Sequence, residues 1–340
     1  MVTLADVKSS NALIPSTLPP GLVAVFVGAT NGIGEVTLKK FAKQSRQPRV
    51  YLVGRSQDAA DRIIAECRML NSAGEYIYIK ADVSLIRVVD EVCDSIKAKE
   101  KTINLLFLSA GLPVLDRSET SEHLHLLAAL TFYSRFRFIT NFLPLLQRAS
   151  GLRRVVTVAG GGIEGKLDST DFPALRIRFI AIRGHIATLI TLGLESIARN
   201  APEVSFVHDY PGTVSTALTK NMPGILGYIA RASIYFFGRW ICVPLEESGE
   251  RHLYLATSAR FPPASGDGDN SGVPLGDGFD VAQGTTGAGS GVYSVGWDCE
   301  SASAAVQKLL AGYREKGLPE DIWRHTESEF KRITVPEARL

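Results

Sequence analysis

The 340-residue sequence has only four cysteines, and no two of them are close along the chain: Cys67, Cys93, Cys242 and Cys299. This spacing excludes a Cys-x-x-Cys redox motif and paired cysteine ligands for a metal. Histidines and carboxylates likewise form no metal-binding pattern, so we predict no metal site. Free thiols are typical of a reducing compartment, and we expect a cytoplasmic protein.

An excess of charge of one sign is also absent, because 37 Lys and Arg are balanced by 35 Asp and Glu. The basic residues are scattered along the chain, which argues against a nucleic-acid partner. No uninterrupted apolar run reaches the ~18 residues of a membrane-spanning helix, and the N-terminus does not resemble a signal peptide. The apolar segment 224–244 is interrupted by Arg231 and Arg239, so we interpret it as a lid over a binding site.

What the sequence does contain is a regular alternation of short apolar runs and helix-length amphipathic segments. The apolar runs occupy residues 22–28, 49–54, 76–84, 103–111, 153–162 and 204–212. This pattern predicts an α/β fold with a doubly wound, Rossmann-type parallel sheet. We expect an N-terminal arm over residues 1–20, a nucleotide-binding domain over 21–260, and a helical and Gly-rich C-terminal extension over 261–340 that packs on the same domain.

A glycine-rich loop, Gly28 to Glu35 with the sequence GATNGIGE, follows the first expected strand and opens a helix. Gly28 permits a tight turn, Gly32 lets a pyrophosphate approach the backbone, and Gly34 lets the helix pack closely on the strand. In the first strand–helix unit of such a sheet, this loop is typical of dinucleotide binding.

With these residues the chain resembles the short-chain dehydrogenase/reductase family, whose loop pattern is TGxxxGIG. The family's acidic-hydrophobic pair after the third strand, its Asn-Asn-Ala-Gly after the fourth and its Pro-Gly after the sixth are matched, the second only in part. The match spans residues 21 to 260, and the whole chain looks like an atypical fungal branch of secondary metabolism. The resemblance implies cofactor contacts from Gly28, Thr30, Asn31, Gly32, Ile33, Gly34, Asp82, Val83, Ser109, Ala110, Gly111, Pro211, Gly212, Thr213 and Val214.

The end of the second expected strand indicates which nicotinamide cofactor is bound. An NAD enzyme places a carboxylate there to accept hydrogen bonds from the ribose hydroxyls. This chain has Arg55 and no carboxylate at the strand end. Because a guanidinium suits a 2′-phosphate, we predict that the cofactor is NADP(H) and that Arg55 contacts it.

The residues that the family uses for catalysis are missing. The resemblance implies a Tyr and a Lys four positions later on one helix, a Ser after the fifth strand and an upstream Asn. The helix after the fifth strand has no Tyr-x-x-x-Lys; Phe179 and Arg183 have that spacing, Gly160 replaces the Ser, and Thr131 lies near the Asn position.

Other side chains are therefore candidates for catalysis. Tyr210 precedes the Pro-Gly turn, Tyr133 lies on the helix that carries the family Asn, and Arg183 matches the family Lys. We expect His185 to face away from the cofactor, and His208 and Asp209 to point to opposite faces of the sheet because they are adjacent on a strand.

Three hypotheses of function remain open at this point. The first, which the resemblance implies, is an NADP(H)-dependent oxidoreductase acting on a hydrophobic, polyketide-like natural-product intermediate. The apolar and aromatic lid would supply a wall of its pocket. The second is a redox-neutral enzyme on the same scaffold, such as an isomerase, cyclase or dehydratase. The third is a non-catalytic NADP(H)-binding protein. The sequence leaves the substrate, the direction of hydride transfer and a homo-oligomeric state undecided.

Overall fold

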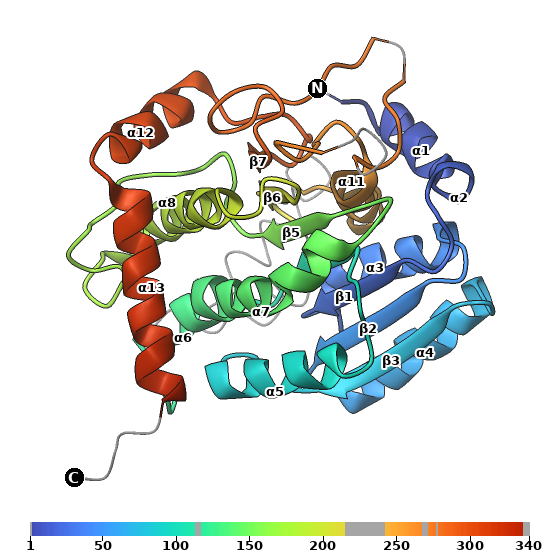
Figure 1. Cartoon of the computed structure of the whole chain (residues 1–340), viewed down its shortest axis with the longest axis horizontal. Helices are drawn as coiled ribbons and strands as arrows, with labels where there is room; N and C mark the ends of the chain where they lie inside the picture. Colours follow the sequence, from blue (N-terminus) through green and yellow to red (C-terminus); the bar gives the residue numbers. More distant parts are fainter. Residues whose placement is uncertain (1, 113–116, 215–241, 267–270, 277, 336–340) are drawn as a thin grey trace.

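A seven-stranded parallel sheet forms the centre of the computed structural model, which describes residues 2–112, 117–214, 242–266, 271–276 and 278–335 (Figure 1). The strands are β1 Val23–Val27, β2 Arg49–Gly54, β3 Glu75–Lys80, β4 Leu105–Leu108, β5 Arg154–Val158, β6 Ser205–Asp209 and β7 Val292–Val295. Their order across the sheet is β3-β2-β1-β4-β5-β6-β7. Each of the six predicted apolar runs overlaps one of the strands β1 to β6, and the predicted doubly wound fold is confirmed.

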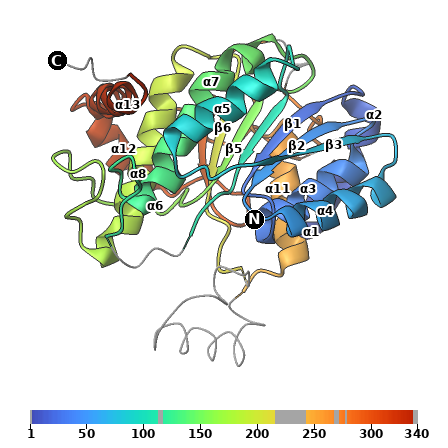
Figure 2. The ribbon, with the colours of Figure 1, turned by 90° about the horizontal axis from the view of Figure 1, so that it is seen from below.

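Helices cover both faces of the sheet (Figure 2). One face carries α1, α3, α4 and α11, and the other carries α5, α7 and α8, with α12 and α13 beyond α8. The bounds are α1 Leu4–Ala12, α2 Ile14–Thr17, α3 Gly32–Gln44, α4 Gln57–Leu70, α5 Ile86–Lys97, α6 Leu126–Ala128, the π-helical turn η1 Ala129–Tyr133, α7 Ser134–Arg148, α8 Phe179–Ala198, α11 Leu245–Thr257, α12 Ala304–Arg314 and α13 Leu318–Thr334.

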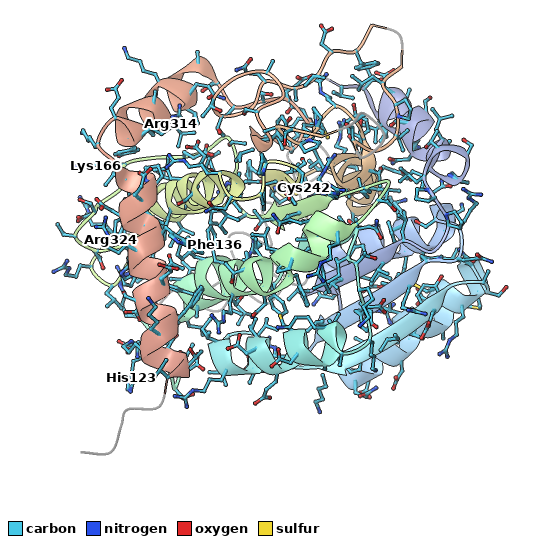
Figure 3. The ribbon with its side chains drawn as sticks, in the orientation of Figure 1. His123, Phe136, Lys166, Cys242, Arg314 and Arg324 are labelled. Carbon is cyan, nitrogen blue, oxygen red and sulfur yellow. The ribbon has the colours of Figure 1, made fainter. Side chains whose placement is uncertain are left out.

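Both terminal segments are held against these helices by long-range hydrogen bonds. At the N-terminal end, Asn11 Nδ2 on α1 donates to the main-chain oxygen and to Oε2 of Glu250 on α11. Near the C-terminal end, Arg314 of α12, labelled in Figure 3, donates to Glu195 of α8 over 2.8 Å. The predicted helical C-terminal region is thus present as α12 and α13, and the segment expected as an N-terminal arm contains α1 and α2.

The most apolar helix of the described chain lies inside the protein. By length and composition α8 could cross a membrane, but 78% of its most apolar window is buried. A core helix passes the same test, and here α8 packs on β6, β7 and α13. Most of the expected lid, residues 224–241, lies outside the described residues; its end is described, and Val243 there pairs with Val214.

The strand order creates a crevice at the carboxyl edge of the sheet. From β1 the chain first builds outward to β2 and β3, then returns to β4 on the other side of β1. The connections that leave β1 and β4 therefore diverge at this point. Open α/β sheets bind their ligands at such a switch point.

Candidate functional site

A cavity of about 840 Å³ lies at this switch point and brings together most of the predicted site residues. Its volume is within the range of known small-molecule sites. The lining residues are Gly28, Thr30, Asn31, Gly32, Ile33, Gly34, Gly54, Arg55, Ala81, Asp82, Val83, Ser109, Ala110, Gly111, Leu112, Leu127, Leu130, Thr131, Arg135, Val158, Ala159, Arg183, Tyr210, Pro211 and Gly212.

The glycine-rich loop has the close backbone approaches that its sequence predicts. Gly28 has φ of +86°, and a Cβ there would lie 2.4 Å from the amide nitrogen of Ala110. A Cβ at Gly34 would lie 2.5 Å from Ser109 Oγ and 2.8 Å from Ala29 Cα. A side chain at either position would therefore push the loop away from β4 and α3 away from β1.

The first turn of α3 faces the cavity with its backbone amides. Asn31 is the N-cap residue and makes no side-chain capping hydrogen bond to the helix. The amides of the first turn have no partner within the helix, and the helix dipole favours a negative group at this end. Together with the tight approach at Gly28 and Gly34, this cradle fits the pyrophosphate of a dinucleotide.

On the β2–β3 side, the cavity is lined by Arg55, Asp82 and Val83. The Arg55 side chain is exposed and has no hydrogen-bond or ion-pair partner among the described residues. Asp82 Oδ1 accepts hydrogen bonds from the backbone N and the Oγ of Ser84, which fix the carboxylate at the strand end. A free cation at the end of β2 fits a 2′-phosphate better than it fits a ribose diol.

On the β4–β6 side, the predicted residues after β4 and β6 also line the cavity, with two exceptions. Ser109, Ala110, Gly111, Pro211 and Gly212 are part of the lining, but Thr213 and Val214 are not. The backbone oxygen of Thr213 accepts from Val243 N over 2.9 Å, and Val214 is buried. These two residues fix the turn instead of lining the cavity.

Two of the three predicted catalytic residues meet in this half. Arg183 on α8 places its guanidinium carbon 4.6 Å from the centre of the Tyr210 ring. Both residues line the cavity. Tyr210 is held through its backbone N, which donates to Val295 O on β7, while its hydroxyl has no partner among the described residues. Within the described part of the chain, the phenol hydroxyl is thus left for a ligand.

Tyr133, the third candidate, does not belong to this group. Its side chain is fully buried and lies outside the cavity lining. The hydroxyl is 2.7 Å from Nε2 of His325 on α13, and burial raises the pKa of the phenol. Its position on the π-helical turn directs Tyr133 toward the C-terminal helix, where it has a packing role.

The structure also describes the residues that the sequence analysis assigned to the family's Ser, Asn and Tyr positions. Gly160 is buried, and a Cβ there would lie 3.0 Å from Ala187 Cβ. Thr131 lines the cavity, but its hydroxyl donates to the backbone oxygen of Leu127. Phe179 is half-exposed beneath the Arg117 guanidinium and outside the lining.

A Tyr-x-x-x-Lys spacing does occur elsewhere, at Tyr76 and Lys80. Both residues lie on β3, and the Tyr76 hydroxyl donates to Asn71 O. Neither residue lines the cavity. This spacing is therefore a strand pattern and not a helical catalytic pair.

Behind the cavity, the adjacent residues His208 and Asp209 point to opposite faces of β6, as their alternation predicts. His208 Nε2 accepts from Gly160 N, and its Nδ1 lies 2.8 Å from Thr191 Oγ1 on α8. Asp209 Oδ2 lies 2.9 Å from Nε2 of His252 on α11. His185 also faces away from the cavity, with Nε2 3.3 Å from Phe172 O. In the described part of the chain, no group of three side chains could hold a metal.

Arg135 is a site residue that the sequence analysis missed. Its side chain is 3% exposed and lines the cavity between the ends of β4 and β5. Leu127, Thr131 and Arg135 follow one another at four-residue intervals, and all three face the cavity. This spacing on one helix face could have identified Arg135 from the sequence.

Comparison with known proteins agrees with this geometry. A family model described as short chain dehydrogenase matches residues 22–165. Oxidoreductase AN1596 of Emericella nidulans is 40% identical over 333 residues, which cover 96% of this chain and 98% of that protein. Oxidoreductase andH of Emericella variicolor is 37% identical over 339 residues, covering 98% of each. Short-chain dehydrogenase/reductase SAT2 of Stachybotrys chartarum is 29% identical over 338 residues, covering 91% and 92%.

Solved structures share the fold at lower identity. The KRED1-Pglu enzyme has a TM-score of 0.55 at 17% identity, covering 75% of this chain and 100% of its own. L-sorbose reductase from Gluconobacter frateurii, solved with NADPH, has a TM-score of 0.51 at 19% identity, covering 70% and 90%. The fold, the loop and the relatives lead to one conclusion: this chain belongs to the short-chain dehydrogenase/reductase family, alongside fungal oxidoreductases that match it over nearly its whole length.

Proposed function

We propose that this protein is an NADP(H)-dependent oxidoreductase that acts on a hydrophobic, polyketide-like natural-product intermediate in the cytoplasm, with Tyr210 as its proton donor. The observation that carries the proposal is the Tyr210 ring beneath the Arg183 guanidinium, in the same cavity as the glycine-rich loop, with a hydroxyl that has no partner among the described residues. NADPH bound to the structurally similar L-sorbose reductase is in line with this cofactor.

When bound, the dihydronicotinamide supplies a hydride to an electrophilic carbon. The amides at the start of α3 would hold the pyrophosphate, and Arg55 would hold the 2′-phosphate. Tyr210 would donate a proton to the carbonyl oxygen, while the Arg183 guanidinium fixes its ring. The apolar side chains of the cavity, Leu112, Leu127, Leu130 and Val158, would bind the body of the substrate and exclude water.

A redox-neutral reaction is the second candidate, and it is favoured by the loss of the family's acid and serine positions. The two functions differ in their dependence on cofactor. A strain that lacks the gene should accumulate the intermediate that this protein consumes. That intermediate, given to the purified protein, should be converted only when NADPH or NADP⁺ is added. Conversion without stoichiometric cofactor turnover would favour the redox-neutral reaction, and no conversion would favour a binding protein.

A further inference from the structure

Two arginines line the β4–β6 half of the cavity. Arg135 on α7 and Arg183 on α8 make no ion pair with any carboxylate in the described part of the chain. Of the two, Arg135 is buried and Arg183 is exposed, and a buried cation without an ion pair is costly in a protein interior. The arrangement therefore needs an explanation. The two arginines lie at the carboxyl edge of the sheet, where the cavity is.

Arg135 is held in place by neutral acceptors. Its Nη1 donates to Thr157 Oγ1 over 2.6 Å and to Val158 O over 2.8 Å, and its Nη2 donates to Ala110 O over 2.8 Å. These bonds orient the guanidinium and leave its charge uncompensated. Burial lowers the pKa of Arg135 to about 10, so the side chain stays charged at neutral pH.

The other titratable groups behind this half do not cancel the two charges. Asp209 interacts electrostatically with Arg135, but its carboxylate is already paired with His252, whose pKa is raised by this contact despite burial. Burial, assisted by Arg135, lowers the pKa of His208 to about 3, so that this imidazole is neutral. Glu164 lies 4.0 Å from His208, and burial raises the pKa of its carboxyl, which disfavours a negative charge there.

The strand order decides which part of the cofactor lies here, and this step rests on the proposed function. With the pyrophosphate at α3 and the 2′-phosphate at Arg55 beside β2, the nicotinamide half extends toward β4, β5 and β6. The nicotinamide ring carries a positive charge in NADP⁺ and none in NADPH. The remaining parts of the cofactor are the same in both forms.

We propose that Arg135 and Arg183 make the cavity distinguish the two redox states, so that it binds NADPH and repels NADP⁺. The protein then takes up reduced cofactor and releases oxidised cofactor after hydride transfer, which suits a reductase. Arg55 lies at the other end of the cofactor and acts on both forms alike.

Isothermal titration calorimetry with NADPH and with NADP⁺ tests this inference without a substrate. The wild-type protein should bind NADPH at least tenfold more tightly than NADP⁺. Arg183→Gln should reduce this ratio severalfold, mainly by strengthening the binding of NADP⁺. The matched control, Arg55→Gln, should weaken both forms and leave the ratio unchanged.

Arg135→Met should reduce the ratio further if circular dichroism shows that the variant folds. If it does not fold, salt provides the second measurement: the ratio in the wild type should fall with rising ionic strength, because Arg183 is exposed and its charge is screened. Equal affinities in the wild type, or a ratio unaffected by Arg183→Gln, would overturn the inference while leaving the proposed function in place. Binding of neither form would contradict the proposed function itself.

Discussion

The two halves of the cavity are built by different means. The half proposed to hold the phosphates is formed mainly by backbone: the turn at Gly28, the close packing at Gly34 and the amides of α3. The half between β4 and β6 is formed mainly by side chains, chiefly Tyr210, Arg183 and Arg135. A backbone cradle cannot change without moving strands and helices, whereas side chains can be exchanged on an intact scaffold. The side-chain half can therefore change its chemistry while the fold and the backbone cradle stay the same.

The largest expected effect comes from filling the backbone cradle. Gly32→Val should remove NADPH binding to below detection, because Gly32 has φ of +63° and begins the helix that faces the phosphates. The strain should also cost about 1–3 kcal/mol of stability. Calorimetry and thermal unfolding measure the two effects.

Gly21→Val is the matched control. Gly21 has a similar φ of +78°, with nothing within 4 Å of an added Cβ, and it precedes β1 at the opposite edge of the sheet. This variant should lose comparable stability and keep its affinity for NADPH. Equal loss of binding in both variants would mean that strain alone, and not the cradle, is responsible.

The next largest effect is on turnover and concerns Tyr210, in the half of the cavity between β4 and β6. Tyr210→Phe should lower turnover by ~10²–10⁴-fold, the usual contribution of general acid catalysis, and should leave NADPH affinity nearly unchanged. Steady-state kinetics on the accumulated intermediate provide the measurement. Tyr133→Phe, which removes a hydroxyl bound to His325 outside the cavity, is the control and should retain turnover. A loss of only a few-fold in Tyr210→Phe would favour a redox-neutral reaction or a pre-activated substrate.

Much of the half of the cavity around the glycine-rich loop could be predicted from the sequence, because its signals are local. The glycine loop, the apolar strands and the absence of a carboxylate after β2 are each contained in one short segment, and Arg55, Asp82 and Val83 lie where those segments place them. Tyr210 and Arg183, which were predicted from chain order, both line the cavity, and their catalytic roles stay predictions.

The second half could be predicted only in part, because it depends on contacts between distant segments. Tyr133 and Arg135 are two residues apart, yet one contacts His325 and the other lines the cavity. The pairing of Asp209 with His252 joins residues that are 43 positions apart. No local pattern encodes such contacts, although the four-residue stripe through Arg135 was a usable signal.

A smaller effect is expected on the preference for NADPH over NADH. Arg55→Asp should cost about 1.5–3 kcal/mol of NADPH binding, the range for hydrogen bonds to charged groups, and should reverse the preference in favour of NADH. Arg68→Asp makes the same change of charge on exposed α4, outside the cavity, and should have little effect. Equal affinities for NADPH and NADH in the wild type would show that Arg55 does not bind the 2′-phosphate.

The smallest effect is on stability and concerns the buried pair of His252 and Asp209. Although burial opposes its charge, the pKa of His252 is raised above its ordinary value of 6.5 by Asp209. Such a group stabilises the folded protein fully below pH 6.5, and this contribution is lost as the pH rises through the raised value. The melting temperature should therefore fall with increasing pH more steeply in the wild type than in His252→Gln. Parallel curves would show that the pair does not affect stability.

A crystal structure of the NADPH complex is the most direct test of the proposed division of the cavity. In this division, backbone holds the phosphates in one half, and side chains carry the reaction in the other. The account predicts the pyrophosphate on the amides that begin α3, the 2′-phosphate beside Arg55 and the nicotinamide at the end where Tyr210 and Arg183 meet. A nicotinamide that points away from Tyr210, or a cofactor bound outside this cavity, would contradict it.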